Sequence, residues 1–416
     1  MNNELNIILC IISLIIILHT IIYMNLGSVV LTNKNTILQL FIWLCTLLIY
    51  YNKCHIGILF IPLILFILNE FLFINYDIDM YNNYDRTKMF YDITTNHFIY
   101  NNHGSQNLTE GIYLHDLYDN KSRMTKEESK NLTDKEANQR RFDKVMIYLG
   151  LDKLNKEELS KISILDMGCG NGEFLLYCSQ KGIHCEGLTI SSEQVEFIGK
   201  KGLKAYEGKY FDKQEQFINK FDIITFFGSL EHMTSGFPGS NAGIEKENKI
   251  RKQILDHCKS YFKGDSKYKY IYSTTLHLNP KYCNTINSYI IERAMSGWYQ
   301  LDSDNQRFFE KAQNEGYTLL MSDDMSWHYY MASIADEDHF GNPDKIKLSH
   351  LASILFGIFV NPFLVYMSIY TITGQWMWQF DGKNHTAYED RNNMKFEEDI
   401  NKRPTTTWWF LLKQNN

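Results

Sequence analysis

The sequence predicts an α/β protein, in which a mostly parallel, doubly wound, Rossmann-like sheet follows N-terminal transmembrane helices. Three observations lead to this prediction. Short apolar runs alternate with helix-forming segments after residue 160, a pattern typical of parallel sheets covered by helices. The first of these runs ends in a glycine-rich turn at residues 168–172. Long apolar runs fill most of the first 75 residues.

The N-terminal apolar runs are residues 5–24, 37–51 and 56–74. The first run carries no charge, and about 20 apolar residues suffice to span a bilayer core. A cleaved signal peptide would need a basic start and a small-residue cleavage site, which this run lacks. We therefore expect residues 1–75 to be a membrane anchor with two or three transmembrane helices, because the middle run is short for a full span.

A polar helical segment, residues 76–160, separates the anchor from the sheet domain, residues 161–416. Apolar side chains at helical spacing, from Phe142 to Leu149, predict one helix over residues 126–150. The expected parallel strands are residues 162–166, 185–189, 205–206, 221–227 and 268–274, with a helix over residues 244–261 before the last.

The C-terminal part holds two further predictions. Residues 376–380 and 406–413 alternate like strands and are expected to close the sheet as a hairpin. The apolar segment 348–376 contains His350, Asn361 and Pro362, so we expect a buried or membrane-resting helix rather than a further span.

Charge and cysteine content exclude some classes of function. The net charge of −6 comes without a basic stripe, which argues against nucleic acid as a partner. The 8 cysteines form no Cys-x-x-Cys pair, and no histidine cluster has metal-ligand spacing, so no metal site is predicted.

The glycine-rich turn is the strongest sign of a ligand. Glycines after an apolar strand let the backbone approach a small molecule with no Cβ in the way. No Lys-Ser/Thr follows, which argues against a phosphate-binding P-loop. The turn resembles the S-adenosylmethionine loop of class I methyltransferases, in which the amino-acid end of the cofactor lies over the glycines. The resemblance implies cofactor contacts from Asp166, Gly168, Cys169, Gly170 and Gly172.

The end of the second strand resembles a narrower family. Residues 187–194, GLTISSEQ, are similar to the corresponding run of cyclopropane-fatty-acyl-phospholipid synthases and their mycolic-acid and sphingolipid methyltransferase relatives. Residues 91–93, 109–113, 221–224, 228–233 and 327–329 also resemble segments of that family, so the similarity covers about residues 90–335. It implies cofactor contacts from Thr189, Ser191 and Gln194.

Asp212 stands where this class usually contacts the adenine of the cofactor. Lys209 replaces the first aspartate of the family's pattern, and a solvated loop aspartate is an equally good interpretation of Asp212.

The resemblance also implies catalytic groups. In the resembled family a bicarbonate ion, held by a Cys, a Glu, a His and a Tyr, accepts a proton. Glu231 matches the glutamate and Tyr329 the tyrosine, whereas Gly111 and Ser273 replace the cysteine and the histidine. The bicarbonate site is therefore incomplete as aligned.

Two of the candidate catalytic residues have alternative interpretations. His277, four residues after Ser273, is a candidate imidazole from the loop after the fifth strand, although a surface histidine is the stronger expectation. Glu231 has a structural alternative as a cap on a helix N-terminus.

The expected function is that of a membrane-anchored, S-adenosylmethionine-dependent methyltransferase acting on the double bond of an unsaturated acyl chain in a membrane lipid. Because the cofactor is cytosolic, the sheet domain is expected on the cytosolic side of the bilayer. Methylation of a lipid headgroup amine or a sterol is an alternative, and so is a membrane-bound S-adenosylmethionine-binding protein that has lost catalysis. The lipid class, the product (ring, branch or methylene) and the oligomeric state stay open.

Overall fold

The computed structural model describes Lys88, Tyr91, Met331 and residues 111–129, 131–233, 241–278, 307–328 and 405–415. The predicted anchor, residues 1–75, lies outside the described residues, as does the apolar segment 348–376. Within the described part, no helix has both the length and the apolar character needed to cross a bilayer.

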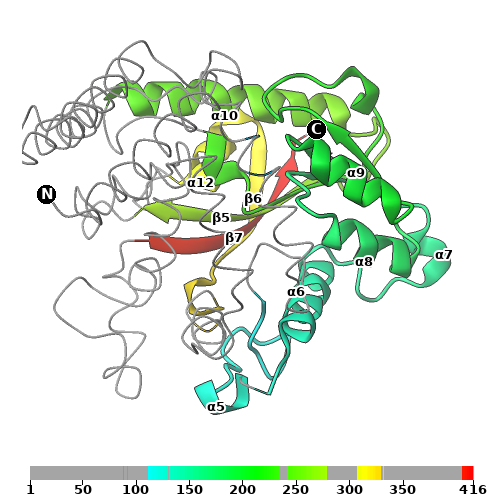
Figure 1. The fold of residues 1–416 in the computed structure, drawn as a ribbon. Helices are drawn as coiled ribbons and strands as arrows, with labels where there is room; N and C mark the ends of the chain where they lie inside the picture. The colour runs from blue at the N-terminus through cyan, green and yellow to red at the C-terminus, as the bar shows by residue number, and fades with distance from the viewer. Residues whose placement is uncertain are drawn as a thin grey trace, which may run out of the picture.

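A twisted seven-stranded sheet forms the centre of the fold, in the order β3-β2-β1-β4-β5-β7-β6 (Figure 1). Its strands are β1 Ser163–Met167, β2 His184–Thr189, β3 Lys204–Glu207, β4 Ile223–Phe227, β5 Tyr270–Leu278, β6 Tyr317–Asp324 and β7 Thr405–Gln414. Strands β1 to β5 are parallel, and β7 runs antiparallel between β5 and β6. The predicted mostly parallel, doubly wound sheet is therefore confirmed.

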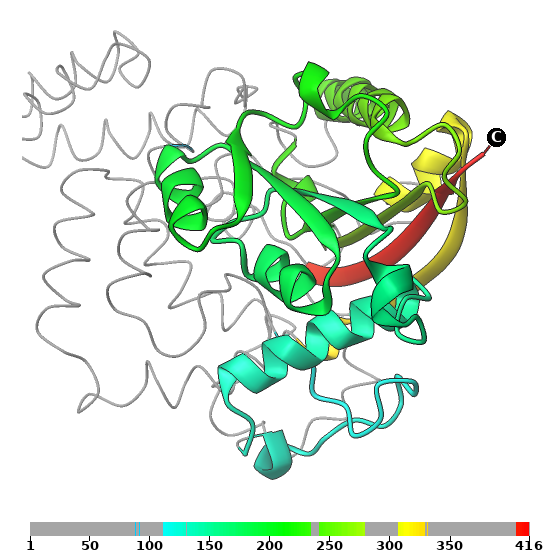
Figure 2. The same cartoon turned by 90° about the vertical axis from the view of Figure 1, so that its right-hand side faces the viewer.

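Helices cover both faces of this sheet (Figure 2). One apolar layer joins α6, Asp134–Tyr148, and α8, Glu173–Lys181, to the sheet through Phe142, Phe174 and Phe227. The opposite layer joins α10, Asn241–Tyr261, and α12, Phe308–Ala312, to the sheet. The remaining elements are α5 Lys126–Ser129, α7 Lys156–Leu159, α9 Ser192–Lys200, η3 Glu215–Phe217, η4 Leu230–Met233 and η5 Gln313–Glu315.

The single helix expected over residues 126–150 is wrong, because the structure has two helices there. Thr133 adopts an extended conformation, and its side chain accepts a hydrogen bond from the N–H of Glu136. The Glu136 carboxylate in turn accepts from the N–H of Thr133 at 2.9 Å. This capping box starts α6 at Asp134 and separates it from α5.

The expected closing hairpin is also wrong in its pairing. β7 confirms the strand at residues 406–413, but both of its edges are occupied, one by β5 and the other by β6. The antiparallel partner of β7 at the end of the sheet is thus Tyr317–Asp324, while residues 376–380 lie outside the described part of the chain.

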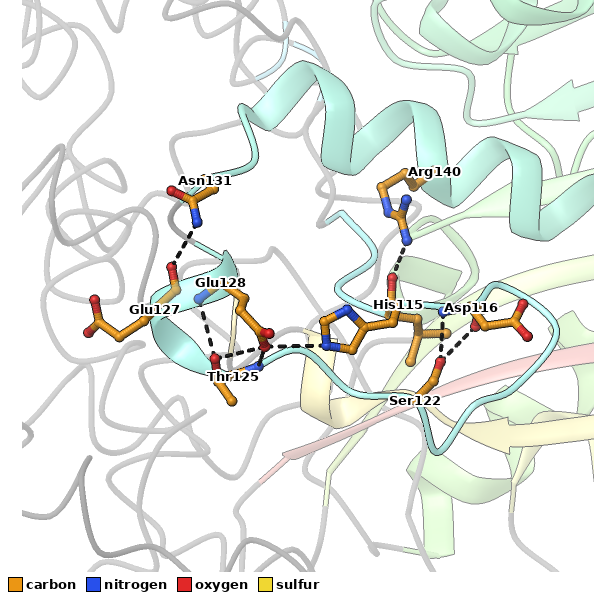
Figure 3. A network of polar contacts seen from close by, with 9 residues as sticks. His115, Asp116, Ser122, Thr125, Glu127, Glu128, Asn131 and Arg140 are labelled. Atoms are coloured by element: carbon orange, nitrogen blue, oxygen red, sulfur yellow. Dashed lines mark hydrogen bonds and ion pairs between the residues drawn. The ribbon is translucent and has the colours of Figure 1, made fainter.

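The segment before α6 is fastened to that helix by polar contacts (Figure 3). Arg140 donates a hydrogen bond to the carbonyl oxygen of Leu114. His115 Nε2 lies 3.3 Å from a carboxylate oxygen of Glu128, which also accepts from the N–H of Thr125 at 2.8 Å. The contact from Arg140 ties this segment to α6, and those of Glu128 tie it to α5; next to Gly111, the N–H of Ile112 donates to the carbonyl oxygen of Ala137 in α6 at 3.0 Å.

Candidate cofactor and catalytic site

The point where the strand order reverses, between β1 and β4, is the expected place for a ligand in such a sheet. Asp166 is buried at the end of β1, and Thr225 of β4 donates a hydrogen bond to its carboxylate at 2.8 Å. Burial raises the pKa of Asp166 to about 7, although the hydrogen bond from Thr225 and the charge of Arg141 act in the opposite direction. A buried carboxylate next to a ligand site is suited to interact with a positively charged group.

The glycine turn is shaped by close packing against β4 and α9. Gly168 has φ +90°, and a Cβ placed on it would lie 2.5 Å from Cβ of Ser229. Gly172 has φ +78°, and its added Cβ would lie 2.7 Å from Cγ1 of Ile198. Gly170 also has a positive φ, of 51°. No side chain fits at Gly168 or Gly172, so the exposed backbone of the turn is preserved for close approach of a ligand.

Cys169 takes part in the turn through its backbone. Its N–H donates to the carbonyl oxygen of Leu188 at 3.0 Å. Its side chain packs with Leu175 and Ile198. The thiol also lies against β2, because a Cβ placed on Gly187 would be 2.5 Å from Sγ. Burial raises the pKa of this thiol. Any contact of Cys169 with a cofactor therefore comes from its main chain.

The residues predicted at the end of β2 lie together and are buried. Ser191 is the N-cap of α9, and its hydroxyl accepts from the N–H of Gln194 at 3.2 Å. Thr189 Oγ1 is hydrogen-bonded to Oε1 of Gln194. Nε2 of Gln194 is buried and has no hydrogen-bond partner among the described residues. Since buried donors are nearly always satisfied, this amide is a fitting donor to a ligand hydroxyl, such as one on the ribose of S-adenosylmethionine.

Asp212 is exposed on the loop after β3, and its N–H donates to the carbonyl oxygen of Lys209 at 3.1 Å. This placement agrees with the alternative of a solvated loop aspartate.

Glu231 forms the centre of a second group of polar side chains, at the end of β4. It is 1% exposed within η4, and Thr275 Oγ1 of β5 donates to its carboxylate at 3.5 Å. Burial and the charge of Glu231 raise the pKa of Tyr91. Burial raises the pKa of Tyr210 as well, with further contributions from Glu231 and Tyr91. The buried carboxylate thus accepts a hydrogen bond from Thr275 and lies within electrostatic reach of two tyrosines, of which Tyr210 donates from its hydroxyl to the carbonyl oxygen of Ser229 at 3.0 Å.

The prediction of a loop or surface position for His277 is wrong. β5 continues to Leu278, so His277 lies within the strand, and it is fully buried. Because side chains alternate along a strand, His277 shares a face with Ser273 and Thr275. Its ring lies 6.2 Å from that of Phe309 in α12. His277 therefore stays a candidate for the site, on the same strand face as the hydroxyl that contacts Glu231.

The residues present do not fit a bicarbonate ion held as in the resembled family. A Cβ on Gly111 would lie 2.3 Å from Cβ of Ala137 in α6, so this position has no room for a cysteine. Ser273 is buried, and its hydroxyl donates to the carbonyl oxygen of Thr274 at 3.4 Å. Tyr329 lies outside the described residues.

The structure adds residues that the sequence did not single out. Tyr210 and Thr275 contact the surroundings of Glu231, and Arg141 reaches the end of β4 and β5 from α6. Only Arg141 left a signal in the sequence, because it is a charged residue on the apolar face of an amphipathic helix.

Comparisons with known proteins agree with this site. Residues 136–265 match a family described as methyltransferase domain. That segment runs from α6 to the end of α10 and includes the glycine turn, the end of β2 and Glu231. Over 78 residues the chain is 38% identical to the "Probable (S)-tetrahydroprotoberberine N-methyltransferase 2" of Papaver bracteatum. That match covers 17% of this chain and 22% of the relative, so the chain spans about a fifth of the relative's length.

Several solved structures are similar at low identity. The [4+2]-cyclase SpnF has a TM-score of 0.49 at 14% identity, with 79% of this chain and 94% of that chain covered. The geranyl diphosphate C-methyltransferase of Streptomyces coelicolor A3(2) has a TM-score of 0.48 at 10% identity, covering 80% and 97%. The cyclopropane synthase MmaA2 of Mycobacterium tuberculosis has a TM-score of 0.43 at 15% identity, covering 68% and 86%.

At these scores the solved structures do not decide what the chain acts on. The match over residues 136–265 includes the glycine turn, whose close packing leaves its backbone exposed, and Gln194, whose Nε2 is buried without a partner among the described residues. Residues 136–265 of the chain therefore match a methyltransferase domain.

Proposed function

We propose that the chain is a membrane-anchored methyltransferase of the cyclopropane-synthase type, which adds a methyl or methylene group to the double bond of an unsaturated acyl chain in a membrane lipid. The observation that carries this proposal is the buried Glu231 just after β4, which accepts a hydrogen bond from Thr275 and lies within electrostatic reach of Tyr91 and Tyr210.

Methylation of an alkene explains why a buried carboxylate would be useful there. Bound S-adenosylmethionine supplies an electrophilic methyl group on a sulfonium. An alkene that takes up this group becomes a carbocation, and a proton must leave before a ring or a new double bond can form. In this proposal Glu231 stabilises the positive charge and accepts that proton without an intervening bicarbonate ion.

The apolar environment supports the same chemistry. The ring of Phe227 lies at the end of β4. Tyr91 and Tyr210 have raised pKa values, so both side chains stay neutral and could offer the substrate an aromatic ring or a hydroxyl group. Neutral aromatic groups tolerate a carbocation and exclude water that would otherwise trap it.

The proposed anchor would bring this site to its substrate. Residues 1–75 are predicted to hold the domain at the cytosolic surface of the bilayer, where a tethered site meets lipid at a high effective concentration. The lipid bilayer would thus be both the location of the protein and the source of its substrate.

The test is expression of the full chain in a host with unsaturated phospholipids, fed with methionine whose methyl group is fully deuterated. We expect label in the acyl chains by mass spectrometry. Loss of one deuterium indicates a ring or methylene product, and full retention indicates a methyl branch. Glu231→Gln should lower acyl labelling by about 100-fold or more. Glu196→Gln, the same change at an exposed position of α9, should leave labelling unchanged.

A second candidate is methylation of a headgroup amine or a sterol. Gly111 favours it, because this position lacks the cysteine of the resembled family and has no room for one beside Ala137. Label in headgroups or sterols, with none in acyl chains, would establish this second function. Absence of label from every lipid, in a protein that still binds S-adenosylmethionine, would instead favour a binding protein without catalysis.

A further inference from the structure

Arg141 is a buried cation at the carboxyl edge of the sheet. The contacts of α6 show that this helix runs antiparallel to β5, because Tyr148 stacks on Tyr272 whereas Arg141 reaches Thr274. Side chains of a helix point toward its N-terminus, so Arg141 extends toward the end of β4, where the guanidinium lies 4.7 Å from the ring centroid of Phe227. The side chain is 0% exposed.

Within the described residues the guanidinium forms no ion pair, although the carboxyl group of Asp166 lies within electrostatic reach. Its one hydrogen bond, from Nη2 to Oγ1 of Thr274, is long at 3.5 Å. Nε and Nη1 are buried and have no hydrogen-bond partner among the described residues. By contrast, the buried Arg251 of α10 lies 3.6 Å from Glu247 and 3.7 Å from Glu315. A buried charge normally has such a partner, so the arrangement at Arg141 indicates that a ligand supplies the anion.

The neighbours of Arg141 place this missing anion next to the glycine turn. The same Thr274 Oγ1 accepts from the N–H of Gly228 at 3.1 Å, so the guanidinium stands at the level where β4 ends. Burial raises the pKa of Asp166, and the positive charge of Arg141 opposes that rise, which places the two groups within electrostatic reach. Asp166 is followed directly by the turn that contains Gly168.

S-Adenosylmethionine carries two positive groups, a sulfonium and an ammonium, and one negative group, the α-carboxylate. We propose that the guanidinium of Arg141 binds this α-carboxylate and so fixes the methionine end of the cofactor over the glycine turn. The planar N–H groups of arginine match the two oxygens of a carboxylate.

This inference depends on S-adenosylmethionine as the ligand of the domain, but not on a lipid as the methyl acceptor. A purely structural role is the competing explanation, since the guanidinium also lies against aromatic rings, Phe227 at 4.7 Å and Trp409 at 6.0 Å. The two explanations differ in one respect: only carboxylate recognition depends on the presence of that group in the ligand.

The experiment compares S-adenosylmethionine with its decarboxylated form by calorimetry on the purified full-length protein. For Arg141→Met we expect affinity for S-adenosylmethionine to fall about 10- to 100-fold, the range for a charge-assisted hydrogen bond, with less than about 3-fold change for the decarboxylated ligand. Lys144→Met removes another buried cation from the same helix, whose Nζ donates to the carbonyl oxygen of Leu117. It should not alter the ratio of the two affinities.

Arg141→Lys covers the case in which the methionine variant does not fold, because it keeps the charge and loses the paired geometry. It should lower the preference for the carboxylated ligand without removing it. Equal weakening of both ligands, or no change in their ratio, would overturn the proposal for Arg141. Failure of the wild-type protein to bind either ligand would overturn the cofactor assignment itself, whereas binding without lipid labelling would contradict only the proposed substrate.

Discussion

Replacement of Gly168 by alanine tests whether the glycine turn is shaped by its contact with β4. The φ of +90° is unfavourable for a residue with a side chain, by about 1–2 kcal/mol. The new Cβ would also lie 2.5 Å from Cβ and 2.8 Å from Oγ of Ser229, an overlap for which overpacked sites suggest about 1–3 kcal/mol. We therefore expect Gly168→Ala to lower the free energy of unfolding by about 2–5 kcal/mol and to weaken cofactor binding.

Gly202→Ala is the matched control, because Gly202 has a φ of +72° and nothing within 4 Å of its added Cβ. This control should show only the conformational term of about 1–2 kcal/mol. The measurement is denaturant-induced unfolding of the purified chain, together with calorimetric binding of S-adenosylmethionine.

Ser229→Gly removes the atoms that the new Cβ would meet, but it also removes the hydrogen bond from Oγ to the carbonyl oxygen of Met167 at 2.8 Å. In the double variant Gly168→Ala/Ser229→Gly, the overlap part of the loss should therefore be recovered, which appears as a coupling energy in a double-mutant cycle. Equal losses for Gly168→Ala and Gly202→Ala, with no coupling to Ser229, would refute the reasoning.

Three further substitutions test other parts of the site. The pKa of Asp166 is raised to about 7, so as pH rises the unfolded chain loses this proton before the folded protein does. The free energy of unfolding should therefore fall between about pH 4 and about pH 7, by no more than about 4 kcal/mol. Asp166→Asn should flatten this part of the pH profile in thermal unfolding. Gly111→Cys should destabilise the protein by about 1–3 kcal/mol, because the new Cβ would lie 2.3 Å from Cβ and 2.8 Å from the backbone carbonyl carbon of Ala137; an equally stable Gly111→Cys variant would show that the position has room. If the imidazole of His277 acts on the substrate, His277→Asn should lower acyl labelling about 10-fold or more and leave the calorimetric affinity for S-adenosylmethionine unchanged. Unchanged labelling in a folded variant would remove His277 from the catalytic candidates.

The strands near the glycine turn could be predicted because their signals are local. β1 and β4 are buried along their whole length, so they appear in the sequence as short, largely apolar runs, whereas β2 was recognisable from its end, residues 187–189, before the polar residues 191–194. The polar residues at their carboxyl ends, such as Asp166 and Thr189, could then be assigned to one edge of the sheet. This assignment uses only neighbouring residues in the sequence, and it gave these strands in the order along the chain that the structure shows.

The far end of the sheet could not be predicted in this way. β6 is an edge strand that ends in Asp323 and Asp324 and exposes Leu320, so it lacks a clear apolar alternation. Its partner β7 lies about 80 residues later in the chain. A strand whose pairing depends on such a distant segment carries little of that information in its own residues.

Side-chain orientation was the main limit within the candidate site. The position of Cys169 in the turn was predictable, but the packing of its thiol against Gly187 depends on how β2 and α8 meet. His277 was assigned to a loop because the apolar run before it ends at Thr274, whereas pairing with Thr406 of β7 extends β5 past it. In both cases a contact from a distant element decided the outcome.

α6 connects these observations. Its residue Ala137 closes the position at which the resembled family has a cysteine, and Arg141, one turn later, brings a buried guanidinium to the end of β4. An anion held between a cysteine and Glu231 is thus replaced by an arrangement with a fixed cation on one helix and a carboxylate on the opposite strand end. If the cofactor carboxylate neutralises Arg141, Glu231 remains as a buried carboxylate just after β4, and under the proposed function it is, beside His277, a candidate to accept the proton from the substrate. Loss of labelling in Glu231→Gln with cofactor affinity unchanged, beside loss of affinity in Arg141→Met, would show that the two charges have these separate roles.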